Sequence, residues 1–151
     1  MNLKETKLNN RPEKEAYYLS IARAVAARST CLRRQYGAVI VKNDEIVATG
    51  YNGAPRGDAN CSDVGECYRQ RMGVPHGEQY EKCVAVHAEQ NAIISASRNE
   101  MMGATLYLYG YDVMADQELS AEPCLLCQRM VKNAGILRVV NRDGELWRQG
   151  D

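Results

Sequence analysis

The stretch CVAVHAEQNAII, residues 83–94, places one of the chain's two histidines two positions before a glutamate, at the start of an apolar run. Small and apolar residues recur in it at helical spacing, so the pattern predicts a helix from about His87 to Arg98. His87 and Glu89 would then lie in its first turn. This arrangement has two interpretations: an ordinary polar helix start, or one half of a metal site.

A second stretch, EPCLLCQRM, supplies a candidate for the other half. Pro123 at the start and Gly135 at the end are typical helix boundaries and predict a helix over residues 124–134. Cys124 and Cys127 are spaced i and i+3, so they share one face of that helix. The positive end of the helix dipole favours thiolate, the form of cysteine that binds metal.

One imidazole and two thiolates occupy three positions of tetrahedral Zn²⁺ and leave the fourth for water, which is the pattern of a catalytic zinc site. Zinc lowers the pKa of its water to about 7, and Glu89 could move a proton from that water to a substrate. Hydroxide attack on an amidine-like ring carbon, followed by loss of ammonia, is a deamination. The combination H-x-E followed by P-C-x-x-C is a known signature of zinc deaminases.

Either motif alone is weak evidence. HAE occurs at ordinary helix starts, and CxxC is also found in zinc ribbons and redox pairs. Their conjunction, with a predicted strand between them, is much more specific, and no thioredoxin-like context surrounds the cysteines. The sequence therefore predicts an enzyme that uses zinc for hydrolytic deamination.

Around these two helices the sequence alternates helices with strands. Residues 13–30 predict a first helix from their helical spacing and frequent alanines. GAVIVKNDEIVATGYN predicts a hairpin, with β-branched runs at 38–41 and 46–48 around the turn KNDE. ATLYLYGY and ILRVV predict two more strands. The order indicates a single α/β domain, residues 1–151, with helices on both faces of a sheet.

The charge balance and the apolar content of the chain argue against two classes of partner, polynucleotides and membranes. Nineteen basic and nineteen acidic residues cancel, which argues against a polynucleotide partner because binding phosphates requires a positive surface. No apolar run approaches the roughly 18 residues that a membrane span requires, so no membrane partner is expected. MNLKETKLNNRPEKEA lacks the apolar core of a signal peptide, and we therefore expect a cytoplasmic protein.

These motifs resemble those of the deoxycytidylate deaminases, within the cytidine deaminase superfamily. The likeness runs from STCLRRQYGAVIVKNDEIVATGYNG through CVAVHAEQNAI to PCLLCQRMVKNAGILRVV, most of the chain. The resemblance implies a three-layer α/β/α sandwich with a mixed sheet of about five strands. It implies conversion of dCMP to dUMP and ammonia, with zinc-bound hydroxide attacking C4 of cytosine. It also implies a homo-oligomer, with a hexamer favoured, and allosteric control by dCTP and dTTP.

The resemblance also implies roles for individual residues. His87, Cys124 and Cys127 would hold the catalytic zinc, and Glu89 would be the proton shuttle. Asn52 in GYNG would hold the sugar, although an asparagine there is equally typical of a turn.

Further roles concern the base and the phosphate. The backbone of Ala88 would contact the pyrimidine. Arg33 and, more weakly, Arg98 are candidates for the phosphate, which suits a planar guanidinium, although most surface arginines are solvated. Three tyrosines are candidates for stacking on the base: Tyr107, Tyr109 and Tyr111.

The remaining cysteines fit a second, structural zinc site. Residues 53–82 form a long connection rich in Gly, Pro, Asn and Asp, which is unusual in a compact domain unless something ties it down. A closed centre of four thiolates would join it to the end of the first helix, and relatives often carry structural zinc in this region. His76 is an alternative ligand, and some of the cysteines are alternatively ordinary buried residues. The four are Cys31, Cys61, Cys67 and Cys83.

Departures from the family pattern leave the substrate open. The segment before PCLLC is longer than usual, and Glu122 stands where Ser, Phe or Tyr is commoner. Deaminases of dCTP, deoxycytidine, a free base or tRNA adenosine are therefore alternatives. A zinc-binding interaction module without catalysis is a further alternative, and it would have no use for Glu89.

Overall fold

The computed structural model describes residues 10–75 and 77–150, so the alternative ligand His76 lies outside the described residues. Among the described residues, no helix combines the length and the apolarity that crossing a bilayer requires. In chain order the elements are α1 (Lys14–Ala26), β1 (Arg34–Lys42), β2 (Glu45–Tyr51), α2 (Cys61–Val64), α3 (Tyr68–Arg71), the 3-10 helix η1 (Tyr80–Lys82), α4 (Ala88–Ile94), α5 (Arg98–Met101), β3 (Thr105–Asp112), β4 (Gln117–Leu119), α6 (Leu125–Ala134), β5 (Arg138–Asn141) and β6 (Gly144–Arg148).

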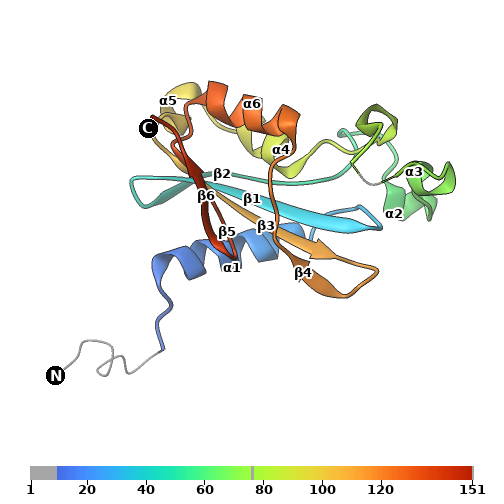
Figure 1. Cartoon of the computed structure of the whole chain (residues 1–151), viewed down its shortest axis with the longest axis horizontal. Helices are drawn as coiled ribbons and strands as arrows, with labels where there is room; N and C mark the ends of the chain where they lie inside the picture. The colour runs from blue at the N-terminus through green and yellow to red at the C-terminus, as the bar shows by residue number, and fades with distance from the viewer. Residues whose placement is uncertain (1–9, 76, 151) are drawn as a thin grey trace.

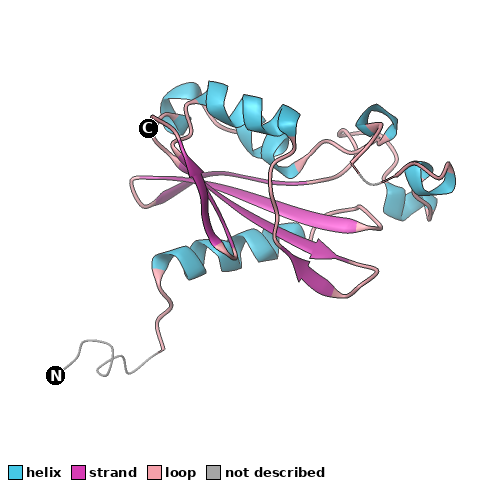
Figure 2. Cartoon of the chain, viewed as in Figure 1, coloured by secondary structure: helices cyan, strands magenta, loops and turns pink. Residues whose placement is uncertain are grey.

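The strands form one mixed sheet in the order β2-β1-β3-β5-β6, with β4 paired to β3 (Figure 2). β1 pairs antiparallel with β2 and with β3, whereas β3 and β5 are parallel. The mixed α/β sheet is confirmed, with six described strands where about five were expected. β4 and β6 were not predicted, because both are short and carry exposed polar residues rather than an apolar run.

The hairpin between β1 and β2 confirms the prediction from KNDE. Asn43 and Asp44 have positive φ angles of 51° and 62°. A two-residue turn with both central residues in this region matches the right-handed twist of the strands that it joins, and Asn and Asp tolerate it better than most residues. The strands extend further than their β-branched runs, because pairing with β3 lengthens β1.

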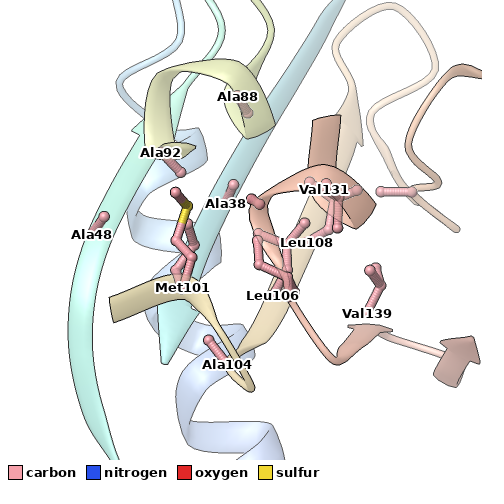
Figure 3. Close-up of a cluster of buried hydrophobic side chains, with 14 residues drawn as sticks. Ala38, Ala48, Ala88, Ala92, Met101, Ala104, Leu106, Leu108, Val131 and Val139 are labelled. Atoms are coloured by element: carbon pink, nitrogen blue, oxygen red, sulfur yellow. The ribbon is translucent and has the colours of Figure 1, made fainter. Parts of the chain in front are cut away.

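Helices cover both faces of the sheet (Figure 1). α1 packs on one face, against residues that include Val39 and Tyr107. α4, α5 and α6 lie on the other face, where Ala38 and Leu108 enter the larger hydrophobic cluster (Figure 3). Successive strand residues point to opposite faces, so each central strand contributes to both clusters. The predicted three-layer arrangement is confirmed.

Two glycines let the helices approach the sheet closely. A Cβ on Gly37 would lie 2.0 Å from the carbonyl oxygen of Ala22 in α1. A Cβ on Gly50 would lie 2.4 Å from the carbonyl oxygen of Ala88 and from the amide nitrogen of Ala92, both in α4. The backbones of α1 and α4 therefore rest directly on opposite faces of the sheet.

The predicted helices are shorter in the structure. α1 ends at Ala26 rather than near residue 30, because the Ser29 hydroxyl and the Thr30 amide both donate to the carbonyl oxygen of Asn52, at 2.9 Å and 3.4 Å. The second predicted helix ends at Ile94 rather than near Arg98, and α5 follows as a separate short helix. Ser97 and Glu100 form a capping box that starts α5, a sequence signature of helix initiation.

The long connection between β2 and α4 has structure of its own. Its base is closed by two hydrogen bonds between Gly53 and Val86, at 3.2 Å and 2.7 Å. Thr30 holds it through Asn60, whose side-chain oxygen accepts the Thr30 hydroxyl at 3.0 Å. α2 and α3 lie in this connection and project beyond the edge of the sheet (Figure 1). We refer to residues 53–86 as the cysteine loop.

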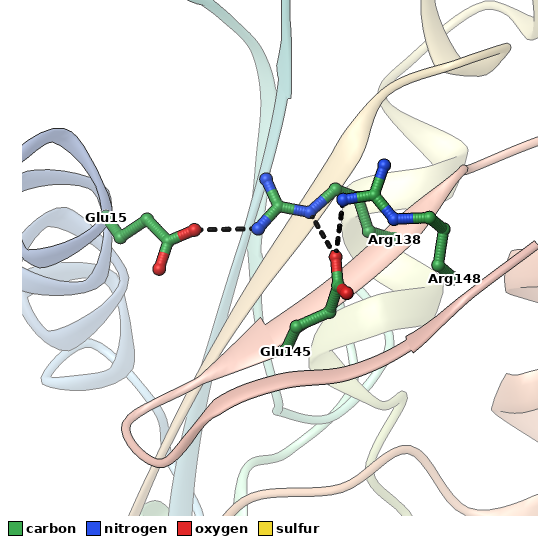
Figure 4. Close-up of polar contacts among 4 residues, drawn as sticks. All are labelled: Glu15, Arg138, Glu145 and Arg148. Atoms are coloured by element: carbon green, nitrogen blue, oxygen red, sulfur yellow. Dashed lines mark hydrogen bonds and ion pairs between the residues drawn. The ribbon is translucent and has the colours of Figure 1, made fainter.

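A charged network joins α1 to the other end of the sheet (Figure 4). The Arg138 guanidinium donates to Glu15 of α1 and to Glu145 of β6, both at 2.7 Å. Arg148 also donates to Glu145, at 2.8 Å. These groups are at least partly exposed, so each pair contributes little to stability, but together they join β6 to β5 and α1.

Candidate active site

The N-termini of two helices bring the predicted zinc ligands together. His87 is the N-cap residue of α4 and Cys124 that of α6, with Cys127 in the first turn of α6. The Nδ1 atom of His87 lies 3.7 Å from the Sγ atom of Cys124 and 3.3 Å from that of Cys127. Within the part of the chain that the structure describes, these are the residues whose possible ligand atoms cluster, all within 4.8 Å of one another.

The geometry of this cluster fits zinc. Bonds of about 2.3 Å to sulfur and 2.0 Å to nitrogen in a tetrahedral site place the nitrogen and a sulfur roughly 3.5 Å apart. The two distances from His87 bracket this separation. Two sulfurs and one imidazole are a donor set that zinc prefers, and three protein ligands leave one position open.

Local contacts hold the first turn of α4 in place. The His87 amide donates to the side-chain oxygen of Gln90 at 2.8 Å, which satisfies one amide of the helix start. The Asn91 side chain donates to the carbonyl oxygen of Tyr51 at 2.8 Å and fastens α4 to the end of β2. With the close approach at Gly50, these contacts explain why the polar residues of HAEQN begin a helix at this place.

Glu89 lies beside the cluster and is only 5 % exposed. It lines the same cavity as His87 and Cys124. Burial raises the pKa of its carboxyl group above the ordinary value, against the hydrogen bonds that it accepts from its own backbone and from Cys127. A carboxyl group that gains a proton more readily than usual is suited to shuttling protons near neutral pH.

Burial also sets the protonation of the ligands. It lowers the pKa of His87, with a smaller effect from the positive charge of Arg69, and so favours the neutral imidazole that binds metal. Burial, followed by the charge of Glu89, raises the pKa of the Cys127 thiol. The sequence argument expected the helix dipole to lower it; at Cys127 burial outweighs the dipole. Metal binding must therefore displace a proton at this sulfur.

The cavity beside the cluster is bounded by three parts of the chain. Residues from the end of α1 to the start of β1, including Arg33 and Tyr36, form one side together with Asn52. The cysteine loop contributes Arg69, Cys67 and Cys83, and Glu122 contributes from the segment before α6. The cavity therefore joins the candidate zinc site to the cysteine loop.

Two of the predicted substrate residues lie in this cavity. Arg33 is half-buried in its wall. Asn52 is 7 % exposed, and its side chain is held by the backbone of β1: its oxygen accepts the Tyr36 amide and its nitrogen donates to the Arg34 carbonyl, both at 2.9 Å. The Asn52 side chain therefore joins the end of β2 to β1, and Asn52 also lines the cavity. Its contact with a sugar stays a prediction.

The other two predicted substrate residues are not in the cavity wall. Ala88 is fully buried against β2, between the wall residues His87 and Glu89, and its backbone contact with a base stays a prediction. Arg98 is exposed on α5, where its guanidinium donates to the carbonyl oxygen of Asn133 at 2.6 Å. The structure does not bring Arg98 to the site.

The tyrosines proposed for base stacking lie on the wrong face of the sheet. Tyr107 and Tyr109 belong to the cluster under α1, and Tyr111 packs against that cluster. The residues between them face the site instead, and Leu108 lines the cavity. The aromatic side chain in the wall is Tyr36, from β1. Strict alternation along ATLYLYGY could have excluded the tyrosines once the site face was known.

The four cysteines of the second predicted site gather in one region without forming a tight cluster. Burial raises the pKa of Cys61, and the next contributions come from the other three. Within the described residues, however, no three of the four have sulfurs within 4.8 Å of one another. All six cysteines are free thiols. The structure thus supports their proximity, and the zinc stays a prediction.

Comparison with known proteins agrees with this site. Residues 12–142 match the model of the cytidine and deoxycytidylate deaminase zinc-binding region. The chain is 43 % identical over 136 residues to the deoxycytidylate deaminase of Mycobacterium phage D29, covering 87 % of this chain and 95 % of that protein. It is 36 % identical over 130 residues to that of Schizosaccharomyces pombe, covering 86 % of this chain but 37 % of the longer yeast protein.

A solved structure agrees at the level of the fold. The crystal structure of dCMP deaminase from the cyanophage S-TIM5, in complex with dCMP and dUMP, is similar with a TM-score of 0.60 and 27 % identity. The similarity covers 87 % of this chain and 82 % of that one. The sheet, the two helix N-termini and the match over residues 12–142 lead to one conclusion: this chain belongs to the cytidine and deoxycytidylate deaminase zinc-binding family.

Proposed function

We propose that this protein is a zinc-dependent deaminase that converts dCMP and water to dUMP and ammonia. The observation that carries the proposal is the buried Glu89 carboxyl group beside a histidine and two cysteines with the spacing of a zinc site. The choice of dCMP is supported by the phage D29 relative, which this chain matches along nearly its whole length. The cyanophage structure with dCMP and dUMP supports it further.

The chain's own residues divide the chemistry among them. Zinc, when bound by His87, Cys124 and Cys127, supplies the Lewis acid that makes water a nucleophile near neutral pH. Glu89 accepts one proton of that water at its carboxylate and passes it to the ring nitrogen of the cytosine. It then moves the remaining proton of the added hydroxyl group to the departing amino group, so that both protons of the water are accounted for as ammonia leaves. Its buried position, which raises its pKa, suits both halves of this task.

The cavity wall suggests how the nucleotide is held. Asn52 is oriented by β1 and retains hydrogen-bonding capacity towards the cavity, since an amide has more donors and acceptors than its two backbone partners use. We assign it to the sugar, the Ala88 backbone to the base and Arg33 to the phosphate, as the family resemblance implies. Arg98 has no part in this arrangement.

A second zinc in the cysteine loop is part of the proposal. Together with Cys31, the loop offers four free thiols, the other three being Cys61, Cys67 and Cys83. Cys31, Cys67 and Cys83 line the cavity and lie near enough to Cys61 to raise its pKa. Binding zinc would draw the four sulfurs into one tetrahedron and close the loop. We expect two zinc ions per chain by elemental analysis.

Assembly, regulation and location remain predictions of the family resemblance. We expect a homo-hexamer that responds to dCTP and dTTP, and a cytoplasmic enzyme. Free thiols at all six cysteines are consistent with a reducing compartment. Sedimentation with and without dCTP and dTTP tests the first two expectations, and cell fractionation tests the third.

An ultraviolet assay of cytosine loss tests the proposed activity. We expect turnover of dCMP, and slower turnover of dCTP, deoxycytidine and cytosine. Glu89→Gln should lower kcat by about 10²- to 10⁴-fold, the usual contribution of general acid–base catalysis, while zinc content is unchanged. Glu45→Gln, at an exposed position in β2, is the matched control and should behave as wild type. Equal turnover of dCMP and deoxycytidine, or full activity of Glu89→Gln, would contradict the proposal.

A further inference from the structure

We propose that Arg69, in the cysteine loop, binds the 5′-phosphate of the substrate and makes the enzyme select nucleotides over nucleosides. This inference rests on the proposed function, because it concerns the substrate of the same site. Arg69 was not singled out in the sequence, where it is one of two arginines in YRQR. Its role follows from where the structure places it.

Arg69 is buried although it belongs to a short helix in a loop. It is 6 % exposed, and it is the buried residue of the four-residue helix α3. Arginine is almost never fully buried unless its charged group interacts with a partner. Arg69 lines the cavity that also contains His87 and Glu89. The loop therefore delivers a cation to the site where the substrate would react.

Two backbone carbonyls hold the guanidinium in position. Its Nη2 atom donates to the oxygen of Pro75 at 3.1 Å and to that of Glu78 at 2.5 Å. These two contacts fix one end of the guanidinium. Arg69 is thus held in a defined position in the wall of the cavity.

A nearby arginine, Arg71, has the exposed environment that is usual for an arginine in a surface loop. Arg71 lies two positions further along α3, is exposed, and forms an ion pair with Glu66 at 2.9 Å. It also lies over the ring of Tyr68, 5.4 Å from its centroid. Arg71 is therefore a solvated arginine of the loop surface, and it is not part of the cavity wall. The two side chains differ in environment although they share a helix.

The charges around the cavity favour an anionic ligand. Arg33 and Arg34 line the cavity on the β1 side, and Arg69 lines it on the loop side. The acidic residues in the wall are Glu89, which is the candidate proton shuttle, and Glu122, which is exposed. Like charges confined in one partly buried cavity repel one another, and a phosphate relieves that repulsion. A guanidinium also matches phosphate through paired hydrogen bonds.

Paired substrates separate this role from a purely structural one. Arg69→Gln should lower kcat/KM for dCMP by about 10- to 100-fold, through KM more than kcat, because a hydrogen bond to a charged group is lost. Its kcat/KM for deoxycytidine should be unchanged. Arg69→Lys should recover part of the loss, since it restores the charge without the planar fork. Arg71→Gln is the matched control and should leave both substrates unaffected.

Binding provides a readout that does not depend on turnover. Calorimetry should show weaker binding of dUMP to Arg69→Gln than to wild type, with no change for deoxyuridine. Equal losses for phosphorylated and unphosphorylated compounds, or loss of one zinc per chain in Arg69→Gln, would show that Arg69 supports the loop instead and would overturn the inference. Unchanged dCMP kinetics would overturn it as well.

The two proposals can fail separately. If wild-type protein releases no ammonia from dCMP or deoxycytidine, the proposed function fails, and the binding of dUMP against deoxyuridine then decides the role of Arg69 alone. If wild type deaminates dCMP and Arg69→Gln does so equally well, the function stands and the inference about Arg69 fails.

Discussion

The protein contains two sets of candidate metal-binding cysteines that differ in how they are held. The possible ligand atoms of His87, Cys124 and Cys127 all lie within 4.8 Å of one another. The four cysteines of the other set lie near one another, but no three of them reach that spacing. The fold therefore brings the first set to the spacing of a zinc site and the second set only into one region.

The difference has a physical origin in burial. α6 buries Cys127, Val131 and Ala134 against the sheet, and α4 rests directly on Gly50. By contrast, α2 has no buried residue, and the buried residue of α3 is the charged Arg69. A segment that buries so little apolar surface gains little stability from packing. The second zinc that we propose would add stability there.

Removing one candidate ligand from each set of cysteines should give the largest difference between the two sets. Cys124→Ala should lower deamination by more than about 10²-fold and release the catalytic zinc, because one of three protein ligands is lost. Cys67→Ala should lose only the loop zinc and retain most of the turnover at saturating dCMP. Zinc content and ammonia release of both variants check the prediction. Equal loss of activity in both would show that the two sites act as one unit.

A pair of glycine substitutions tests whether the sheet itself preorganises the first set. Gly50→Ala forces α4 away from β2, and Gly37→Ala forces α1 away from β1, since each new Cβ meets helix backbone. Each should lower the free energy of unfolding by roughly 1–3 kcal/mol or more, as overpacking does. Only Gly50→Ala moves His87, so kcat should fall in that variant and remain near wild type in folded Gly37→Ala. Urea unfolding and steady-state kinetics measure the two effects, and a normal kcat in Gly50→Ala would contradict the argument.

Metal removal should increase the mobility of residues 61–83 without increasing that of the sheet. Chelation should raise amide hydrogen exchange in residues 61–83 by about 10-fold or more, because that segment lacks a core of its own. The amides of β3 should keep their protection, since the sheet is packed on both faces. Exchange followed by mass spectrometry, with readdition of zinc as the control, checks this expectation. An unchanged loop would remove the second zinc centre from the proposal.

The smallest effect is expected at a site remote from both cysteine sets. The hydrogen bond from Arg138, with help from Arg148, lowers the pKa of the exposed Glu145 below its usual 4.5. A depressed carboxyl pKa contributes stability above pH 4.5, and that contribution is lost as the pH falls through the folded-state pKa. Glu145→Gln should therefore make unfolding less pH-dependent below pH 4.5, without altering zinc content. Thermal unfolding across that range measures it, and an unchanged slope would show that the network of Figure 4 contributes nothing.

The predictions that succeeded concern residues with a local signature. The turn KNDE, the helix start at Pro123 and the helix start in HAEQN are all visible within a few residues, and each lies where it was expected. β4 and β6 carry no apolar pattern and exist because a neighbouring strand offers a free edge. The early end of α1 likewise depends on a distant partner, the carbonyl group of Asn52.

The candidate site divides in the same way. The sequence by itself determined which residues are the candidate zinc ligands and which is the candidate proton shuttle. The proposed chemistry requires those residue types at helix starts, and two short motifs contain all of them. Only the tertiary structure decided that Tyr107, Tyr109 and Tyr111 face α1, that Arg98 lies away from the site and that Arg69 enters the cavity. The direction of a side chain in a sheet or a long loop depends on which segments pack against it, and packing joins residues that the sequence keeps far apart.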